Sequence, residues 1–249
     1  MKVHSGTLGL TIIVAIWQLV DLLQLFNPIY FASPLEVLAE SFDILSTSTI
    51  YSDISHTVLR VLTALVISLL VGVPVGLLLG YYSKIHALFG GFLDFMRSIP
   101  PVVFFPLFYI ALGPNDSSRI MTAALGASVL GILVVSKYTM QLDKTRLHYF
   151  RSLNFSQFML FKNIIWYESL PAVIVAAKAI SSWVVVIIIV TEMLVGPKHG
   201  LGARVQSVQI TNNIPDLFFT IILIGAVGLI INILITMTEK RLIFWLQSD

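Results

Sequence analysis

The 249-residue chain has no cysteine and few charged residues. Without cysteine it has no disulfide framework, no thiolate nucleophile and no cysteine-ligated metal site. Charged residues make up 11% of the sequence, whereas soluble proteins contain about 25%. Hydrophobic residues make up 57%, so the composition predicts an integral membrane protein. A net charge of +2 is too small to indicate a nucleic-acid partner.

Several kinds of site are also missing from the sequence. No two of the five histidines have the spacing of metal ligands, so no metal site is predicted. The Gly-x-x-x-x-Gly-Lys-Ser/Thr phosphate cradle does not occur, nor does a Ser/His/Asp or paired-carboxylate arrangement on one segment. We therefore expect no enzymatic activity, no ATP site and no cofactor in this chain. Energy for any transport must come from a partner or from an ion gradient.

Six apolar runs approach the length of about 20 residues that a membrane-spanning helix needs. The third is short, and its prolines remove backbone hydrogen bonds and favour a kink. The first could be a signal peptide, but Gln18 and Asp21 lie within it and no small-residue cleavage site follows, which favours an uncleaved helix. We therefore predict an all-α membrane protein with one domain, residues 1–249. Its expected spans are 8–26, 58–82, 97–112, 120–138, 170–195 and 217–237.

The distribution of basic residues predicts the orientation of these spans. The segment 27–57 has no lysine or arginine, whereas the segments that follow the second and fourth runs and the last run all carry them. Cytoplasmic loops of membrane proteins are enriched in such residues. We therefore expect both termini and the loop 142–169 to be cytoplasmic, an alternation that an even number of spans satisfies.

Two segments on the opposite side are more than simple linkers. Ser33 is suited to an N-cap and Pro34 to a first helical position, so a short amphipathic helix is expected over 34–45. The segment 196–216 begins with clustered glycines and continues with a polar stretch that can form a helix. It is either a plain extracytoplasmic loop or a gate that lines a cavity beside the bundle.

The loop 142–169 carries apolar residues in steps of three or four, which predicts one face of a helical hairpin. Asn154 falls between the two helical pieces and tolerates the left-handed conformation of a sharp turn. Exposed phenylalanines need a surface to cover them, which could be the membrane, other loops of the chain or a cytoplasmic subunit. The residues of this face are Leu147, Phe150, Asn154, Phe158, Phe161 and Ile165.

A series of motifs in fixed order resembles one known family. The motifs are "SPLEVL" from Ser33, "GVPVGLLLG" from Gly72, "RSIPP" from Arg97, "VTEMLVGPKHGLGARVQ" from Val190 and "EKRLIFW" from Glu239. Together they resemble the binding-protein-dependent ABC importer permeases for nitrate, sulfonate, taurine and bicarbonate. The family's signature loop has Glu-Ala-Ala, a glycine and a proline. The matching positions keep that spacing but hold other letters, with His148, Tyr149 and Phe150, then Asn154, then Pro171.

The resemblance implies a type I importer fold like that of the methionine permease, in a bacterial inner membrane. Two such chains, identical or related, would form the pore, and an extracytoplasmic binding protein would deliver the solute. Two ABC ATPase subunits, which hold ATP and Mg²⁺, would dock on the loop 142–169. The solute would be nitrate, a sulfonate, taurine, bicarbonate or a heterocyclic precursor. The expected ATPase-coupling residues are His148, Tyr149, Phe150, Arg151, Asn154, Phe158 and Phe161.

Ionisable and kinking residues within the spans are candidates for the transport pathway, because charges in a membrane are costly and often functional. Lys178 either extends to the cytoplasmic surface or faces the pore. Glu192, near the outer end of its span, either forms an ion pair with Arg60 or Arg204 or lines a gate. The full set of pathway and gate candidates is Arg97, Pro100, Pro101, Lys178, Ser182, Trp183, Glu192, Gly200 and Gly202.

Two other functions remain open at this point. The altered signature loop is compatible with a degenerate or scaffold half of a heterodimeric permease. An ion-coupled secondary transporter is the other alternative, but the chain shows no internal inverted repeat and few carboxylates within its spans. Persistence of transport without any ATPase would favour that second alternative.

Overall fold

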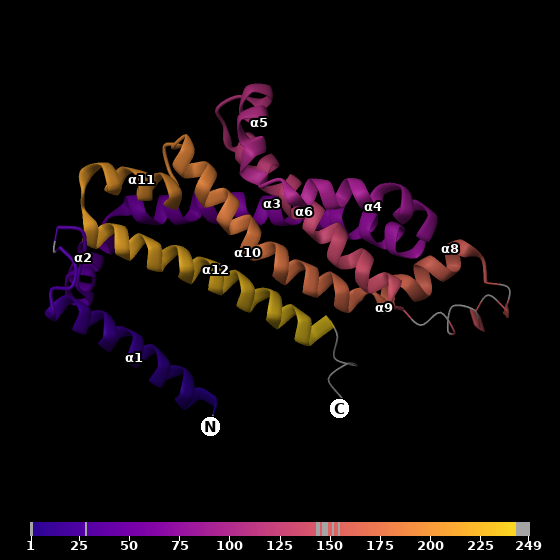
Figure 1. The fold of residues 1–249 in the computed structure, drawn as a ribbon, viewed down its shortest axis with the longest axis horizontal. Helices are drawn as coiled ribbons and strands as arrows, with labels where there is room; N and C mark the ends of the chain where they lie inside the picture. Colours follow the sequence, from indigo (N-terminus) through magenta and orange to yellow (C-terminus); the bar gives the residue numbers. More distant parts are fainter. Residues whose placement is uncertain are drawn as a thin grey trace. The chain divides into compact units, whose positions relative to one another are not determined.

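The computed structural model describes residues 2–27, 29–142, 145, 149–150, 152–153 and 155–242. In this part of the chain the secondary structure is helical (Figure 1). The helices before the first long loop are α1 (Lys2–Leu22), α2 (Pro34–Ser46), α3 (Ser48–Tyr81), α4 (Ser83–Ser98), the 3₁₀ turn η1 (Pro101–Phe104), α5 (Phe105–Leu112) and α6 (Asp116–Met140). Those that follow are α8 (Gln157–Leu160), the π-helical turn η2 (Phe161–Ile165), α9 (Trp166–Glu168), α10 (Leu170–Leu194), α11 (Leu201–Thr211) and α12 (Ile214–Leu242).

The chain divides into two compact units. Unit 1 comprises residues 1–57 and 192–227, and unit 2 comprises residues 58–191 and 228–249. The boundaries between them fall inside the continuous helices α3, α10 and α12. The prediction of one domain over 1–249 stays a prediction.

In unit 1, α2 starts with a reciprocal cap. The backbone N–H of Glu36 donates to Ser33 Oγ at 3.2 Å, and the backbone N–H of Ser33 donates to Glu36 Oε2 at 2.8 Å. Pro34 occupies the first turn, where its missing N–H costs nothing. The helix starts at the residue expected from the sequence because all three of these signals are local.

In unit 2, the apolar core forms around close contact between α3 and α6. Gly76 and Gly80 of α3 lie directly against the α6 backbone and side chains. Small residues at this spacing let two helices approach closely. Beside them Leu77 and Val135 are fully buried and share a cluster with Ala176 of α10.

Replacing Gly80 with alanine should destabilise the protein. The added methyl group would lie 2.5 Å from Thr139 Cβ and 2.7 Å from the Ser136 carbonyl oxygen, so α3 and α6 would have to move apart. Overpacking of this kind costs about 1–3 kcal/mol. The control is Gly91→Ala in α4, where nothing lies within 4 Å of the added methyl. We expect a lower apparent Tm in detergent for Gly80→Ala alone, and equal values for the two variants would contradict the packing role.

Within the described residues, four helices are long and apolar enough to cross a membrane: α3, α6, α10 and α12. A fifth span is obtained if α4 and the segment Pro101–Leu112 count together, although they are bent by 90°. The structure thus supports an all-helical membrane protein with four or five candidate spans. The predicted first span corresponds to a shorter apolar helix, Thr7–Leu22. It ends there because Gln24 takes a left-handed φ of 50°.

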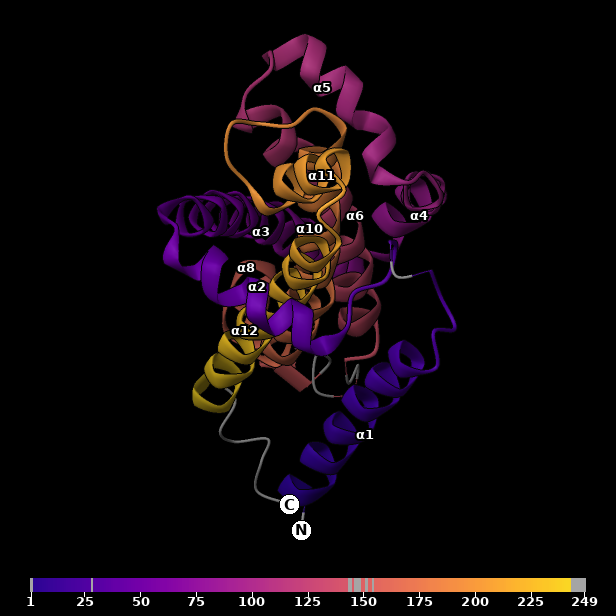
Figure 2. The same ribbon diagram turned by 90° about the vertical axis from the view of Figure 1, so that its left-hand side faces the viewer.

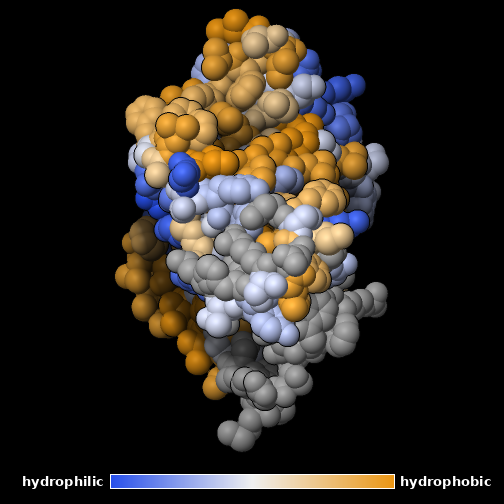
Figure 3. All heavy atoms as spheres, turned by 90° about the vertical axis from the view of Figure 1, so that its right-hand side faces the viewer, coloured by the Kyte–Doolittle hydropathy of each residue, from blue (hydrophilic) through white to orange (hydrophobic). Residues whose placement is uncertain are grey.

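The third apolar run, in which the sequence predicts a kink, departs most from a simple membrane-spanning helix. The run expected over 97–112 is the last turn of α4, then η1, then α5, and α5 leaves α4 at a steep angle in two views (Figures 1 and 2). Pro100 and Pro101 separate the two helices and cannot donate backbone hydrogen bonds. The surface over α5 is strongly hydrophobic (Figure 3), and Ile110 is 84% exposed.

Candidate functional site: a pocket, a capped helix and a loop

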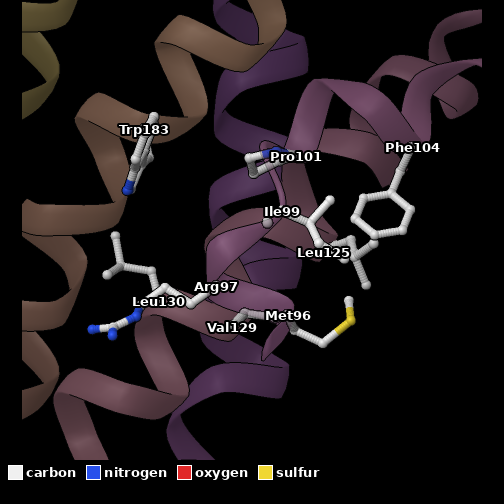
Figure 4. A pocket seen from close by; sticks show the side chains of 10 residues that line it. Met96, Arg97, Ile99, Pro101, Phe104, Leu125, Val129, Leu130 and Trp183 are labelled. Carbon is white, nitrogen blue, oxygen red and sulfur yellow. The ribbon is translucent and has the colours of Figure 1, made fainter. Parts of the chain in front are cut away.

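A pocket in unit 2 brings together three of the predicted pathway residues, Arg97, Pro101 and Trp183 (Figure 4). Its volume is about 50 Å³, and α6 supplies one wall through Leu125, Val129 and neighbouring residues. Pro100 and Ser182 are exposed and adjacent in sequence to the lining residues. The bend between α4 and η1 therefore shapes the pocket.

The bend depends on one glycine of α6. A methyl group added at Gly126 would overlap the ring of Pro101, so the close approach requires a residue without a side chain. The Val103 N–H donates to the Pro100 carbonyl at 3.0 Å, which closes the first turn after the break. Pro101 thus packs directly against Gly126 of α6. The chain turns away from α4 at this point, close to Arg97.

In unit 1 the N-terminus of α11 is capped by side chains from remote parts of the sequence. The backbone N–H of Gly200 donates to Asp53 Oδ1 at 3.0 Å, that of Leu201 to Thr57 Oγ1 at 2.8 Å, and that of Gly202 to Glu192 Oε2 at 2.8 Å. The first N–H groups of a helix have no partner within the helix. Carboxylates at this end are also stabilised by the positive end of the helix dipole. The structure therefore brings together three of the predicted candidates, Glu192, Gly200 and Gly202.

The cap is buried and internally connected. The Thr57 hydroxyl donates to the Glu192 carboxylate, with both oxygens at 3.0 Å, and the Glu192 side chain is fully buried. Gly200 has a φ of 150°, a conformation that residues with side chains rarely adopt. This explains the glycine at position 200, which permits the turn that leads into α11.

An ion-pair network continues from the cap. Arg204 Nη2 lies 2.7 Å from Asp216 Oδ2, and Arg204 Nη1 lies 3.8 Å from Asp53 Oδ2. His199 Nδ1 lies 3.6 Å from Asp53 Oδ1, and its ring stacks on His56 with centroids 5.2 Å apart. The first turn of α11 is thus tied to the start of α3 through Asp53 and to the start of α12 through Asp216.

Lys178 of α10 forms an ion pair with Glu239 of α12 within unit 2. The two side chains are 31% and 30% exposed, so both are partly removed from solvent. Sequence reasoning singled out Lys178 but missed its partner, because Glu239 stands at the polar end of an apolar run beside further charges. Asp53 and Thr57 were missed too, since nothing near them in the sequence marks them as caps.

The described part of the predicted coupling loop separates into an anchored and an exposed portion. Phe161 packs against the core cluster that contains Ile165, and its ring lies 6.3 Å from that of Tyr81. Phe158 is 73% exposed and Tyr149 is 61% exposed. The common face expected for Phe158, Phe161 and Ile165 is therefore wrong. A π-helical turn over 161–165 changes the residue spacing per turn on which that expectation rested.

The remaining coupling candidates lie at or beyond the limits of the described residues. Phe150 is partly buried, with its ring 5.5 Å from that of Phe155. The Phe155 N–H donates to the Phe150 carbonyl at 3.3 Å. His148, Arg151 and Asn154 lie outside the described residues, so the turn expected at Asn154 stays a prediction.

These features define a class of protein before any comparison: an all-helical, multi-pass membrane protein with a small pocket among its helices and an exposed aromatic segment between two of them. Residues 72–244 match the family described as "Binding-protein-dependent transport system inner membrane component". The match covers most of the chain, and the chain belongs to that family. It is therefore the permease component of a binding-protein-dependent ABC importer, a multi-pass inner-membrane protein. Permease subunits lack ATPase activity, and no cofactor is expected in the chain.

Curated relatives agree with this assignment. The chain is 27% identical over 226 residues to a probable ABC transporter permease protein of Brucella melitensis, which covers 90% of this chain and 91% of that protein. It is 24% identical over 210 residues to the taurine transport system permease protein of Escherichia coli, covering 81% and 74%. It is 20% identical over 244 residues to a putative aliphatic sulfonates transport permease protein of Bacillus subtilis, covering 98% and 88%.

The fold is similar to that of a solved transporter chain. A chain from the inward facing conformations of the MetNI methionine ABC transporter superposes with a TM-score of 0.68. The alignment covers 78% of this chain and 96% of that chain at 15% sequence identity. At this identity the similarity concerns the fold alone, and it agrees with the methionine-permease-like fold expected from the sequence.

Proposed function

We propose that this chain is one half of a dimeric importer pore for a small polar or anionic solute. It crosses the inner membrane six times, counting Thr7–Leu22 and the bent α4–α5 pair as spans, and both termini are cytoplasmic. The family implies an ATPase and a binding protein as partners. Relatives named for taurine, aliphatic sulfonates and bicarbonate support a solute of that size and charge.

In this proposal the segment 142–169 couples the permease to the ATPase. The observation that carries it is the contrast between Phe161, which anchors the segment on the core, and Phe158, which is 73% exposed a short distance away. A large exposed aromatic residue on an anchored short helix fits the role of a contact residue that a partner buries. The outer segment 196–216, held by its cap, is the gate of the same pathway.

Replacing Phe158 with aspartate tests the coupling role. We expect at least a thirtyfold loss of ATPase co-purification and of ATP hydrolysis stimulated by the binding protein, because truncating a central interface aromatic costs about 2 kcal/mol or more. The measurement uses the chain co-expressed with its ABC ATPase and binding-protein partners. The apparent Tm of the isolated permease should stay unchanged, since Phe158 is exposed.

Two comparison variants make the result specific. Ser156→Asp introduces the same charge two residues away and can still accept the Met159 N–H that Ser156 Oγ accepts at 3.2 Å. It should retain the ATPase. Phe161→Asp should instead lower the apparent Tm, because that ring packs on the core. If Phe158→Asp keeps full coupling, the segment is not the docking site, and transport without any ATPase would point to a secondary transporter.

A further inference from the structure

The polar groups that line the pocket of Arg97 and Trp183 are hydrogen-bond donors. Among the described residues that line it, Arg97 and Trp183 are the two with polar side-chain groups. A guanidinium and an indole N–H are both hydrogen-bond donors that accept nothing. The rest of the wall is hydrophobic or glycine, including Leu130 and Pro101. Such a site favours a hydrogen-bond acceptor with negative charge and disfavours an ammonium group.

The donors are available to a ligand. Arg97 is exposed and has a loose contact with Asp94, with Arg97 Nη2 and Asp94 Oδ1 separated by 3.5 Å. Exposed pairs of this kind contribute little, and the other guanidinium N–H groups remain for a second acceptor. Trp183 is 46% exposed. In Figure 4 its indole nitrogen points toward the side of the pocket on which the Arg97 guanidinium lies, with Leu130 drawn between them.

The size of the pocket limits what enters it. A cavity that holds a single water molecule has a volume of roughly 10–15 Å³ on the same scale. The pocket measures about 50 Å³, enough for one compact headgroup but not for a bulky molecule. The hydrophobic wall then contacts whatever short apolar portion the headgroup carries. A carboxylate, a sulfonate or another small oxyanion fits this combination of size, charge and donors.

We propose that Arg97 and Trp183 form a binding site in the transport pathway for the anionic group of the solute. The inference rests on the proposed transport function and adds to it the residues that bind the anionic group. Arg97 binds the oxyanion through its planar pair of N–H groups, and Trp183 donates a further hydrogen bond from its indole nitrogen. Asp94 competes for Arg97 and keeps the binding weak enough for release.

The test uses two probes of nearly equal size, methanesulfonate and its neutral analogue dimethyl sulfone. The full chain, with its ATPase partner, is placed in phosphatidylcholine nanodiscs, and binding is read from relaxation of the probes' methyl proton signals. We expect saturable binding of methanesulfonate and none of dimethyl sulfone. Equal binding of the two probes would overturn the proposal.

Variants then locate the site. Arg97→Gln should weaken methanesulfonate binding at least tenfold, as expected for a charge-assisted bidentate contact. Trp183→Phe keeps the ring, removes the donor and should weaken binding about threefold. Asp94→Asn should strengthen it about threefold by removing the competing carboxylate. Lys84→Gln, at an exposed lysine of the same helix, changes the net charge equally and should leave binding unaltered. Unchanged binding in Arg97→Gln would overturn the assignment.

Two further arms separate the sources of failure. A lipid phosphate has the same oxyanion chemistry, so the titration is repeated with phosphatidylglycerol in the nanodisc. Abolition of methanesulfonate binding there would assign the site to lipid headgroups and overturn the proposal, and retained binding supports it. The same preparation shows whether the ATPase co-purifies with the wild-type chain. Loss of the ATPase counts against the proposed function, whereas an assembled complex that does not distinguish the two probes counts against this site alone.

Discussion

Replacing Glu192 with leucine should speed backbone amide exchange at the start of α11 about a hundredfold. The carboxylate accepts hydrogen bonds from the Gly202 N–H and from the Thr57 hydroxyl in a fully buried position. Leucine offers no acceptor, so these donors lose their partner where water cannot replace it. Leaving them unsatisfied costs about 3 kcal/mol. At about 1.4 kcal/mol for each factor of ten, the opened state becomes about a hundred times more populated.

Hydrogen–deuterium exchange with peptide-level mass spectrometry over 196–211 measures this effect directly. Glu192→Gln keeps one acceptor oxygen and should give a smaller increase in the exchange rate. The exchange rate over 196–211 should therefore rise in the order Glu, Gln, Leu at position 192. Asp43→Leu makes the same kind of change at an exposed carboxylate of α2 in the same unit and should leave exchange over 196–211 as it is. Wild-type protection in the Leu variant would show that the cap does not hold α11 in place.

The same cap shows which parts of the structure could be predicted from the sequence. The α2 cap of Ser33 and Glu36 was predictable in part because its partners are three residues apart. The bond between Thr57 and Glu192 joins residues 135 positions apart, and no local signal connects them. Glu192 drew attention only because a carboxylate at the end of an apolar run is unusual.

In the pocket and in the loop, too, features set by neighbouring residues were predictable, and features set by distant residues were not. The two adjacent prolines predicted a kink in the third apolar run, but the 90° bend also depends on Gly126, in another helix. Along the loop, the expected common face of Phe158 and Phe161 assumed a regular α-helical period. A π-helical turn breaks that period, and its cause lies in packing against the core rather than in local propensity.

Removing one member of the Lys178–Glu239 ion pair should destabilise the protein more than removing both. Glu239→Gln leaves the Lys178 ammonium partly buried between α10 and α12 without its carboxylate. A charge without a partner in a membrane-spanning segment costs up to about 3 kcal/mol. We discount this to about 1–2 kcal/mol, because roughly a third of each side chain remains exposed.

The double variant Lys178→Met/Glu239→Gln removes the isolated charge as well. Met is close to Lys in length and keeps the packing of the aliphatic stem, so the double variant should recover most of the lost stability. Apparent Tm values of the four proteins form a double-mutant cycle, with an expected coupling energy of about 1–2 kcal/mol. Strict additivity of the two single changes would mean that the pair is not coupled. Recovery in the double variant would mean that Lys178 is held by Glu239 of α12 in the state studied, and any role for Lys178 in the pathway would then require this pair to open.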